Sequence, residues 1–366
     1  HAATTPMRPE AVAAMLPFLT EHFGNPSGSH AIARAARAAI DEARDAVAAC
    51  LGAAPGDIVF TGSGTEADNL AIAGTVARRA GVTVCSAVEH HAVLHSVEAL
   101  GGRLANVDGA GRVDLDHLAS ILDDTVTVVS VMLVNNEVGT IQPLDDVAAV
   151  VRRHAPHAVL HTDAVQAFPW LDVATAAAAA DLVAVSAHKF GGPKGVGALV
   201  VRPGVDLDPI VRGGGQERDR RSGTHNVAGI VGMAAAMRAT VAGRAAEVGV
   251  ATARRDRLVD GLLAAVDGAV ETGDRSAKVG GNCHVRFPGV ESEALLLLLD
   301  DAGVCASAGS ACASGAIEPS HVLVAMGIDG ADALSSVRLT VGHSTTDDDI
   351  DLVLKVVPDA VARLRR

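Results

Sequence analysis

Polar side chains that can do acid–base or covalent chemistry follow five predicted β-strands, each at the point where the strand ends. The five segments are GSGTE, EHH, NNE, DAVQ and SAHK, and they contain Thr65, Glu66, Glu89, His90, His91, Asn135, Asn136, Asp163, Gln166, Ser186, His188 and Lys189. The carboxyl ends of parallel strands border the ligand-binding crevice of an open sheet. A single such segment would more often be structural, but five of them at the same edge of a sheet predict a functional site.

Asp163 and Lys189 indicate the kind of cofactor that this site could hold. A pyridine nitrogen stays protonated beside a carboxylate, and an aldehyde forms a Schiff base with an amine. The chain has only four lysines, and two of them, Lys189 and Lys194, lie within SAHKFGGPKG. Their concentration in one turn favours a functional role over a solvated surface position.

The segment GSGTEADN supplies the third part of the constellation. It follows a predicted strand and begins a helix, so the backbone N–H groups of Gly64, Thr65 and Glu66 can hold an anion such as phosphate. It is not a nucleotide-binding fingerprint, and GGPKGVG at 191–197 lacks the Ser or Thr that follows a P-loop lysine. A carboxylate, an amine and a phosphate cradle together predict pyridoxal phosphate.

A histidine pair leaves a metal site open as an alternative. His91 and His95 are spaced i, i+4 on a predicted helix and could share a zinc ion. However, the segment lacks the glutamate of H-E-x-x-H, and no third ligand is evident. Aromatic residues make up only 2% of the chain, so His90 is the better candidate for a ring that stacks on a cofactor.

Composition excludes several other classes of protein. The net charge of −13 is spread along the chain without a Lys/Arg cluster, which argues against direct nucleic-acid binding. No apolar run approaches the roughly 20 residues that span a bilayer, and we expect a soluble, cytoplasmic protein. Five cysteines without a C-x-x-C pair predict free thiols, not a disulfide framework or a cysteine-rich zinc site.

The elements that must position these groups alternate between helix and strand from about residue 30 to 202. Predicted strands are DIVF at 57–60, VTVCS at 82–86, TVTVVSVMLV at 125–134, AVLHT at 158–162, DLVAVS at 181–186 and GALVVR at 197–202. Ser29 is the expected N-cap of a helix that ends at Gly52. This alternation predicts an α/β fold with a mostly parallel, buried central sheet flanked by helices.

The pattern changes near residue 245. A helix is predicted from about Val248 to Val266, followed by CHVRFPG, the helix ESEALLLLLDDAG, the strand SSVRLTVG and a last helix capped by Thr346. We therefore expect a large domain over 12–245 and a smaller α+β domain formed by 1–11 and 246–366. Cys312 lies in this second part, in SAGSACASGAIEPSH, where a lone thiol stands among small residues that cannot pack a core.

Taken together, the motifs resemble the pyridoxal-phosphate-dependent cysteine desulfurases of the class V aminotransferase superfamily, in particular the group I (NifS/IscS-like) branch. The resemblance runs nearly end to end. It is carried by AATTP at 2–6, GNPSGSH at 24–30, FTGSGTEADNLAI at 60–72, EHHAVL at 89–94, NNEVGTIQP at 135–143, DAVQ at 163–166, SAHKFGGPKGVGAL at 186–199, GGGQER and RSGT within 213–224, and SAGSAC at 307–312. It implies the fold of type I pyridoxal-phosphate transferases.

The resemblance also implies a role for each site residue. Lys189 forms the Schiff base and moves the Cα proton, Asp163 holds the pyridinium N–H, and His90 stacks on the ring. Gln166 forms a hydrogen bond with the ring phenolate oxygen, and three further residues position the substrate carboxylate. The phosphate ligands implied are Gly64, Thr65, Ser186 and His188, with Thr224 contributed across a homodimer interface. The residues implied to position the substrate carboxylate are Asn25, Asn136 and Arg338.

Cys312 is the implied sulfur acceptor. Its thiolate attacks the sulfur of L-cysteine, becomes a persulfide, and releases the substrate as alanine. A thiol needs help to ionise and must then meet a partner, so a Gly/Ser/Ala loop that can move between pocket and surface suits both steps. The persulfide would go to an acceptor protein for iron-sulfur cluster assembly or thiolation. Selenocysteine lysis, another class V reaction or a catalytically silent scaffold remain the alternatives.

Overall fold

The computed structural model describes residues 1–308 and 318–366, and its largest element is a seven-stranded sheet. The strand order is β1-β7-β6-β5-β4-β2-β3. The strands are β1 (Ile58–Thr61), β2 (Val82–Ser86), β3 (Arg103–Ala105), β4 (Val126–Ser130), β5 (Val159–Asp163), β6 (Leu182–Ser186) and β7 (Gly197–Val201). Strands β2 to β6 pair in parallel, and β7 runs antiparallel to both β6 and β1. The predicted α/β class is therefore confirmed.

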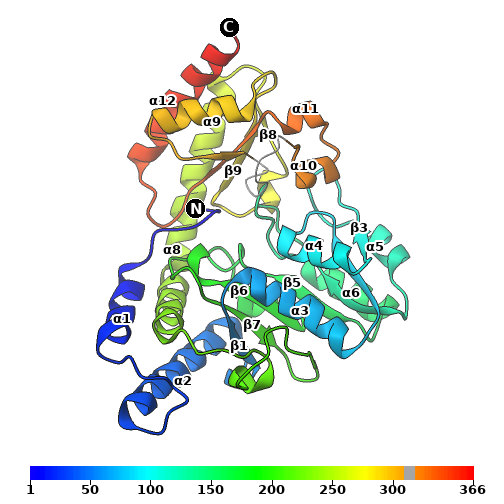
Figure 1. Cartoon of the computed structure of the whole chain (residues 1–366). Coiled ribbons are helices and arrows are strands. Elements are labelled where there is room, and N and C mark those ends of the chain that lie inside the picture. The colour runs from blue at the N-terminus through cyan, green and yellow to red at the C-terminus, as the bar shows by residue number, and fades with distance from the viewer. Residues whose placement is uncertain (309–317) are drawn as a thin grey trace.

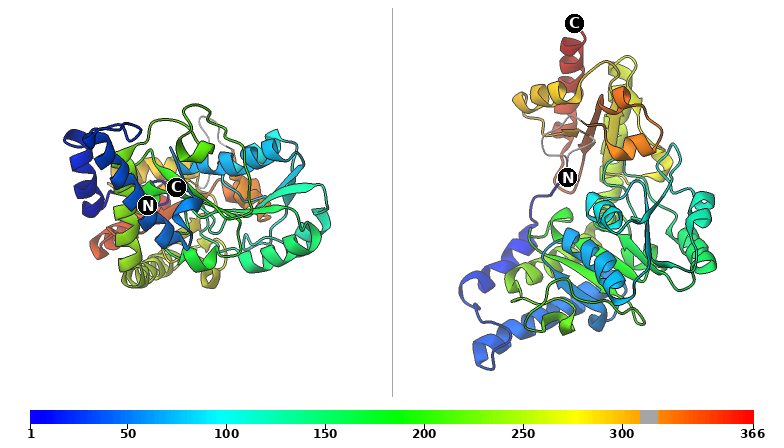
Figure 2. Two further views of the ribbon diagram at one scale, coloured as in Figure 1. Left: turned by 90° about the horizontal axis from the view of Figure 1, so that it is seen from below. Right: turned by 45° about the vertical axis from the view of Figure 1, so that its right-hand side comes forward.

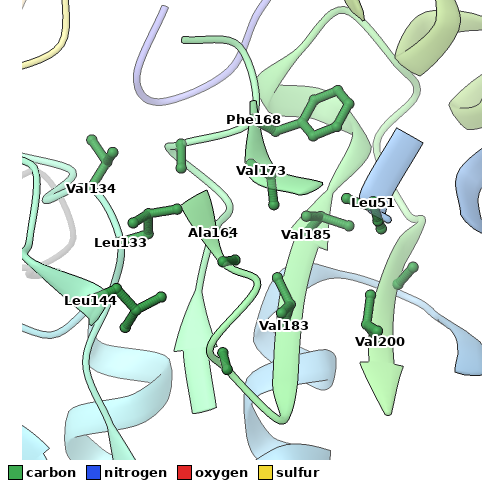
Figure 3. Close-up of a cluster of buried hydrophobic side chains, with 14 of the residues drawn as sticks. Leu51, Leu133, Val134, Leu144, Ala164, Phe168, Val173, Val183, Val185 and Val200 are labelled. Carbon is green, nitrogen blue, oxygen red and sulfur yellow. The ribbon is translucent and has the colours of Figure 1, made fainter. Parts of the chain in front are cut away.

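Helices cover both faces of this sheet (Figure 1). Those that precede or surround it are α1 (Pro9–Thr20), α2 (Ala31–Leu51), α3 (Gly64–Arg78), α4 (His91–Ala99), α5 (Leu115–Ile121), α6 (Leu144–His154) and α7 (Val173–Ala176). Successive strand residues point to opposite faces. Val183 and Val185 accordingly pack into one apolar cluster, shown in Figure 3, whereas Leu182 and Ala184 pack against α3 on the other side.

A second, smaller sheet forms from the C-terminal part of the chain. Its order is β10-β11-β9-β8, all antiparallel, with β8 (Val270–Glu271), β9 (Asn282–Arg286), β10 (Ser307–Ala308) and β11 (Ser336–Thr340). Its helices are α9 (Ser292–Asp301), α10 (His321–Ala325), α11 (Gly330–Ala333) and α12 (Asp347–Leu364). Phe287 and Leu299 are among the buried residues of a separate apolar core there. Figure 2 shows this part beside the large sheet and its helices.

One long helix, α8 (Val227–Ala265), joins the two parts. Its 39 residues correspond to about 58 Å at 1.5 Å per residue. The prediction placed the start of this helix near Val248, which was wrong by some twenty residues. The N-terminal half is rich in Ala and Gly and buried over much of its circumference, so it lacks the apolar periodicity that identifies a surface helix. None of the helices in the described ranges is long and apolar enough to cross a membrane.

The predicted helix ends are partly confirmed. Thr346 caps α12 and exchanges hydrogen bonds with Asp349, and Gly52 ends α2 in the left-handed region with φ of 61°. The N-cap of α2 is His30 and not Ser29, because the imidazole Nδ1 of His30 accepts from the Ala33 N–H at 3.2 Å. Ser29 was predicted as the N-cap from its residue type alone, whereas the acceptor side chain of His30, one position later, caps the helix.

A buried ion pair fixes the loop that leads into α8. Glu217 lies in η3 (Gln216–Asp219) with a side chain only 1% exposed, and its carboxylate accepts two hydrogen bonds from the Arg44 guanidinium at 2.6 and 2.9 Å. It also accepts from the Phe60 N–H and interacts with the His225 ring. These contacts hold residues 217–219 in left-handed backbone conformations, with φ between 50° and 63°.

Replacement of Glu217 by Ala should lower the free energy of unfolding by about 3–5 kcal/mol, because it leaves the Arg44 charge buried without its partner. Burial opposes ionisation of Glu217, but hydrogen bonds from His225 and Arg44 lower its pKa to about 2. The contribution is therefore present above the ordinary pKa of a glutamate and is lost as pH falls from about 4.5 to about 2.

Denaturant unfolding measures this effect, with Arg37→Ala as the matched control on the same helix. Arg37 pairs with Asp41, but both side chains are more than half exposed, so its loss should cost no more than about 0.5 kcal/mol. Equal effects of the two replacements would contradict the buried-pair explanation.

Candidate active site

A cavity of about 300 Å³ opens at the carboxyl edge of the large sheet, facing the small sheet. Its walls come from the N-terminal segment, the start of α3, the ends of β4, β5 and β6, and the middle of β11. The predicted site residues that line it are Gly64, Thr65, His90, Asn136, Asp163, Gln166, Ser186, His188, Lys189 and Arg338. The structure thus brings together residues that are up to 274 positions apart, from 64 to 338.

The start of α3 forms the expected anion cradle. Ser63 is the N-cap and its hydroxyl accepts from the Glu66 N–H at 3.1 Å, which leaves the preceding N–H groups at the positive end of the helix. At Gly64 a Cβ atom would lie 2.9 Å from the Val165 side chain and 3.1 Å from that of Ser186. Only glycine allows α3 to begin this close to β5 and β6, so Gly64 is required by packing as well as by the predicted ligand.

Asp163 is the last residue of β5 and is 4% exposed. Its Oδ1 accepts from the Val165 N–H at 2.8 Å. Burial raises the pKa of the Asp163 carboxyl, while the Val165 N–H and the nearby Lys189 ammonium oppose that increase. A buried carboxylate with one hydrogen bond and one nearby cation is well suited to pair with a protonated ring nitrogen, which would supply a further positive charge.

Lys189 ends the short helix η2 (Ala187–Lys189), which follows β6 directly. Its ammonium donates to the backbone carbonyls of Ala2 and Ala3, the latter at 3.0 Å. Gln166 donates to the same Ala2 carbonyl at 2.8 Å, so the N-terminal segment closes one wall of the cavity. Lys194 is exposed and does not line this cavity.

Two histidines face Lys189 in uncharged form. His90 caps α4, and its Nδ1 accepts from the Ala92 N–H at 3.1 Å. Burial, followed by repulsion from Lys189, lowers the pKa of His90 to about 4, and the same two causes lower the pKa of His188 to about 4. A neutral His90 ring can stack on an electron-poor aromatic ring without adding a second positive charge beside Lys189.

The small sheet contributes the cation that the substrate side needs. Arg338 lies in the middle of β11, is 6% exposed, and donates to the Asn136 carbonyl at 2.7 Å. The Asn136 side-chain Oδ1 is buried and has no hydrogen-bond partner within the described residues. A guanidinium beside an amide offers a site for a carboxylate, because the guanidinium can pair with it through two hydrogen bonds.

Three predicted site residues are not brought into the cavity. Asn25 is exposed in the loop between α1 and α2, where its side chain accepts from the Ser27 N–H at 3.0 Å. Thr224 is exposed after η3, and a role across a dimer interface cannot be seen in one chain. Cys312 lies outside the described residues. The roles of these residues stay predictions.

Sequence reasoning missed Asp68, which also lines the cavity and is 1% exposed. The available signal was its position on α3. It lies four residues after Gly64 and one after Ala67, on the face that is otherwise apolar and buried. A charged residue on such a face is uncommon unless it is paired or functional.

The structure gives no support for a metal site at His91 and His95, the two histidines that suggested one. His91 and His95 stack with ring centroids 4.7 Å apart, and His91 also packs against His321 at 4.6 Å. Within the described part of the chain, the group whose possible ligand atoms converge to within 4.8 Å is Asp68, His90 and Asp163, inside the cavity just described. All three residues line the cavity that would hold an organic cofactor.

The donor set fits pyridoxal phosphate: a helix N-terminus for the phosphate, a buried carboxylate for the ring nitrogen and an amine for the aldehyde. Fold and site together define a pyridoxal-phosphate-dependent enzyme. A family model described as aminotransferase class V matches residues 1–353. The chain belongs to the class V aminotransferase family, and within it to the IscS/NifS-like cysteine desulfurases.

Relatives support this assignment over the full length of the chain. An "IscS-like cysteine desulfurase" from Mycobacterium tuberculosis is 45% identical over 381 residues, covering 100% of this chain and 96% of the relative. Among solved structures, a "NifS-like protein" matches with a TM-score of 0.92 at 33% identity, covering 99% and 98% of the two chains. A structure described as "SspA in complex with cysteine" matches with a TM-score of 0.82 at 29% identity, covering 94% and 98%.

The lowered pKa of His90 leads to a pH prediction. Its ring should stay neutral until the pH falls to about 4, whereas an unfolded histidine is protonated near 6.5. Because the unfolded chain binds that proton first, His90 should reduce stability progressively as pH falls from about 6.5 to about 4. NMR titration of the histidine rings tests the value, with the His90 signal assigned by its loss in His90→Asn. A His90 midpoint between pH 6 and 7 would contradict this account.

Proposed function

We propose that this cysteine desulfurase transfers sulfur from L-cysteine to the thiol of Cys312, releasing L-alanine and leaving a persulfide. The observation that carries the proposal is the placement of Lys189, Asp163 and Arg338 around one cavity, with strand β10 paired to β11 at Ser307 and Arg338. The first two residues suit a pyridoxal phosphate site, and Arg338 suits an amino-acid carboxylate.

The residues around the cavity divide the work of the reaction. When bound, the cofactor supplies a conjugated ring that withdraws electrons from the substrate Cα. Asp163 keeps the ring nitrogen protonated, and Lys189 holds the aldehyde carbon and then moves the proton at the substrate Cα. Arg338 and the Asn136 amide orient the substrate carboxylate.

Six further residues would hold the cofactor in place. Gly64, Thr65, Ser186 and His188 bind its phosphate at the start of α3 and the end of β6. Gln166 donates a hydrogen bond to the ring oxygen, in exchange for its present bond to Ala2. His90, whose ring is neutral, would stack on the cofactor ring.

Sulfur transfer balances without an external oxidant. The Cys312 thiolate forms a bond to the substrate sulfur as the substrate Cβ–S bond breaks. The substrate carbon keeps the electron pair and takes a proton, which yields alanine, and the enzyme retains the sulfur as a persulfide. Cys312 is four residues beyond Ala308, the last described residue of β10, so a chain of that length reaches at most about 14 Å.

We further propose that the enzyme works as a homodimer and passes its persulfide to an acceptor protein of iron-sulfur assembly or thiolation. Thr224 lies exposed beyond the loop that Glu217 anchors, which is where a residue that completes the partner's phosphate site should lie. Residues 12–245 then form the cofactor domain, and 1–11 with 246–366 form the domain that carries Cys312. Asn25 is assigned to substrate binding in the assembled enzyme.

Attachment of the cofactor tests the role of Lys189. After borohydride reduction, the wild type should gain the mass of one phosphopyridoxyl group per chain, and Lys189→Ala should gain none. Lys194→Ala is the matched control, because Lys194 is exposed five residues further along and should keep full labelling. Labelling of Lys189→Ala, or its loss in Lys194→Ala, would assign the Schiff base to another amine.

Alanine formation from L-cysteine in the presence of reductant tests the role of Cys312. We expect Cys312→Ser to abolish sulfur transfer and Lys189→Ala to reduce alanine formation by about a hundred- to ten-thousand-fold. Cys305→Ser, which removes the exposed thiol seven residues earlier, should retain activity. Full turnover by Cys312→Ser would show that sulfur leaves without this thiol, as in selenocysteine lysis or another class V reaction.

A further inference from the structure

Three carboxyl groups are buried together behind the predicted cofactor position. Asp68, Glu89 and Asp163 are 1%, 0% and 4% exposed and come from α3, the loop after β2, and β5. An oxygen of Asp68, an oxygen of Asp163 and a ring nitrogen of His90 lie within 4.8 Å of one another. Asp68 and Asp163 so close in a low-dielectric region would repel each other strongly if both were ionised, and Glu89 adds to this repulsion, so the protons must be distributed unequally.

His161 stands next to Asp68 and offers a place for one proton. It lies two residues before Asp163 on β5, hence on the same face of the strand, and it is completely buried. Its Nδ1 is 2.8 Å from the Ser130 hydroxyl, and its Nε2 is 3.6 Å from Asp68 Oδ1. Neither Nε2 nor Oδ1 has a hydrogen-bond partner elsewhere among the described residues, so each is the other's nearest complement.

Whether Asp68 carries a proton depends on the charge of His161. Burial lowers the pKa of His161 to about 3, so the ring is neutral and cannot balance a negative charge on Asp68. In the tautomer that donates its Nδ1 proton to the Ser130 hydroxyl, the ring presents a lone pair at Nε2. In that tautomer a proton on Asp68 Oδ1 faces the lone pair across 3.6 Å, whereas an ionised Asp68 would place negative charge against it.

The other two carboxyls differ in their surroundings. Glu89 accepts from the Ser86 hydroxyl at 3.0 Å and from the Met132 N–H at 2.7 Å. Burial, opposed by the Met132 N–H, raises the pKa of Glu89 to about 8, so it also holds a proton at neutral pH. Asp163 alone has Lys189 as a nearby cation, and of the three it is the one best placed to be ionised.

We propose that Asp68 is a positioning residue that holds a proton against His161, so that Asp163 presents the single negative charge to the ring nitrogen of the bound cofactor. This rests on the proposed role of Asp163. A second charge at Asp68 would change the protonation of the cofactor and of its bond to Lys189. The titratable groups around Asp68 are Glu89 and His90 after β2, and His161 and Asp163 on β5, with Lys189 acting on Asp163.

Burial, with repulsion from Asp163 and then from Glu89, raises the pKa of Asp68 well above its ordinary value, which agrees with this assignment. In this proposal Asp68 and Glu89 are protonated at neutral pH, and Asp163 is ionised. Because each carries a proton, Asp68 and Glu89 add no net charge to the site.

Infrared spectroscopy of the holoenzyme at neutral pH tests the proton on Asp68 directly. The wild type should show the carbonyl band of protonated carboxyl groups, and Asp68→Asn and Glu89→Gln should each remove a separate part of it. Both replacements are neutral and of nearly unchanged shape, so Glu89→Gln serves as the matched control. An unchanged band in Asp68→Asn would overturn the proposal, since Asp68 would then be ionised in the wild type.

The visible absorbance of the bound cofactor tests whether that proton matters to the site. Asp68→Asn should match the wild type at neutral pH and depart from it only at alkaline pH, where the wild-type Asp68 loses its proton. A difference already present at neutral pH, or none at any pH, would overturn the positioning role. Asp163→Asn separates the two proposals. If it leaves the visible spectrum unchanged, the role proposed for Asp163 fails, while the infrared result for Asp68 still stands or falls by itself.

Discussion

The burial of negative charge beneath the cavity is the constraint on which the rest of the site depends. Asp163 ends a strand that is covered on both faces, and its carboxyl receives one backbone hydrogen bond and the field of Lys189. A positive partner favours the ionised form of a carboxyl group in such a place. The protonated ring nitrogen of pyridoxal phosphate is such a partner, so binding of the cofactor and ionisation of Asp163 favour each other.

The parallel sheet explains why this charge lies where a ligand can reach it. Strands β4, β5 and β6 all end at one edge, and their last residues, Ser130, Asp163 and Ser186, are polar. The helix that begins at Gly64 reaches this edge only because glycine avoids the Val165 and Ser186 side chains. Close packing therefore requires glycine at a position that the sequence also predicts for anion binding.

The substrate side of the site is built from the other sheet. Arg338 belongs to β11, whose neighbours are β9 and the short strand β10, and it reaches across to the Asn136 carbonyl. The cofactor side and the carboxylate side thus lie on separate apolar cores that α8 connects. A substrate held between them contacts both parts at once, which gives a physical basis for coupling their relative position to substrate binding.

The sequence alone predicted the α/β class, most strand positions and ten residues that line one cavity, because strand-end turns, a helix N-terminus and a lysine within a glycine-rich turn are local signals. It did not identify β3, which is three residues long and contains no β-branched residue, or the true start of α8 at Val227. Only the tertiary structure decided that Asp68 and His161 meet beneath Asp163, and that Asn25 lies away from the cavity within one chain. Burial, and with it the protonation of a carboxyl group, depends on which segments pack together, and no local pattern specifies that.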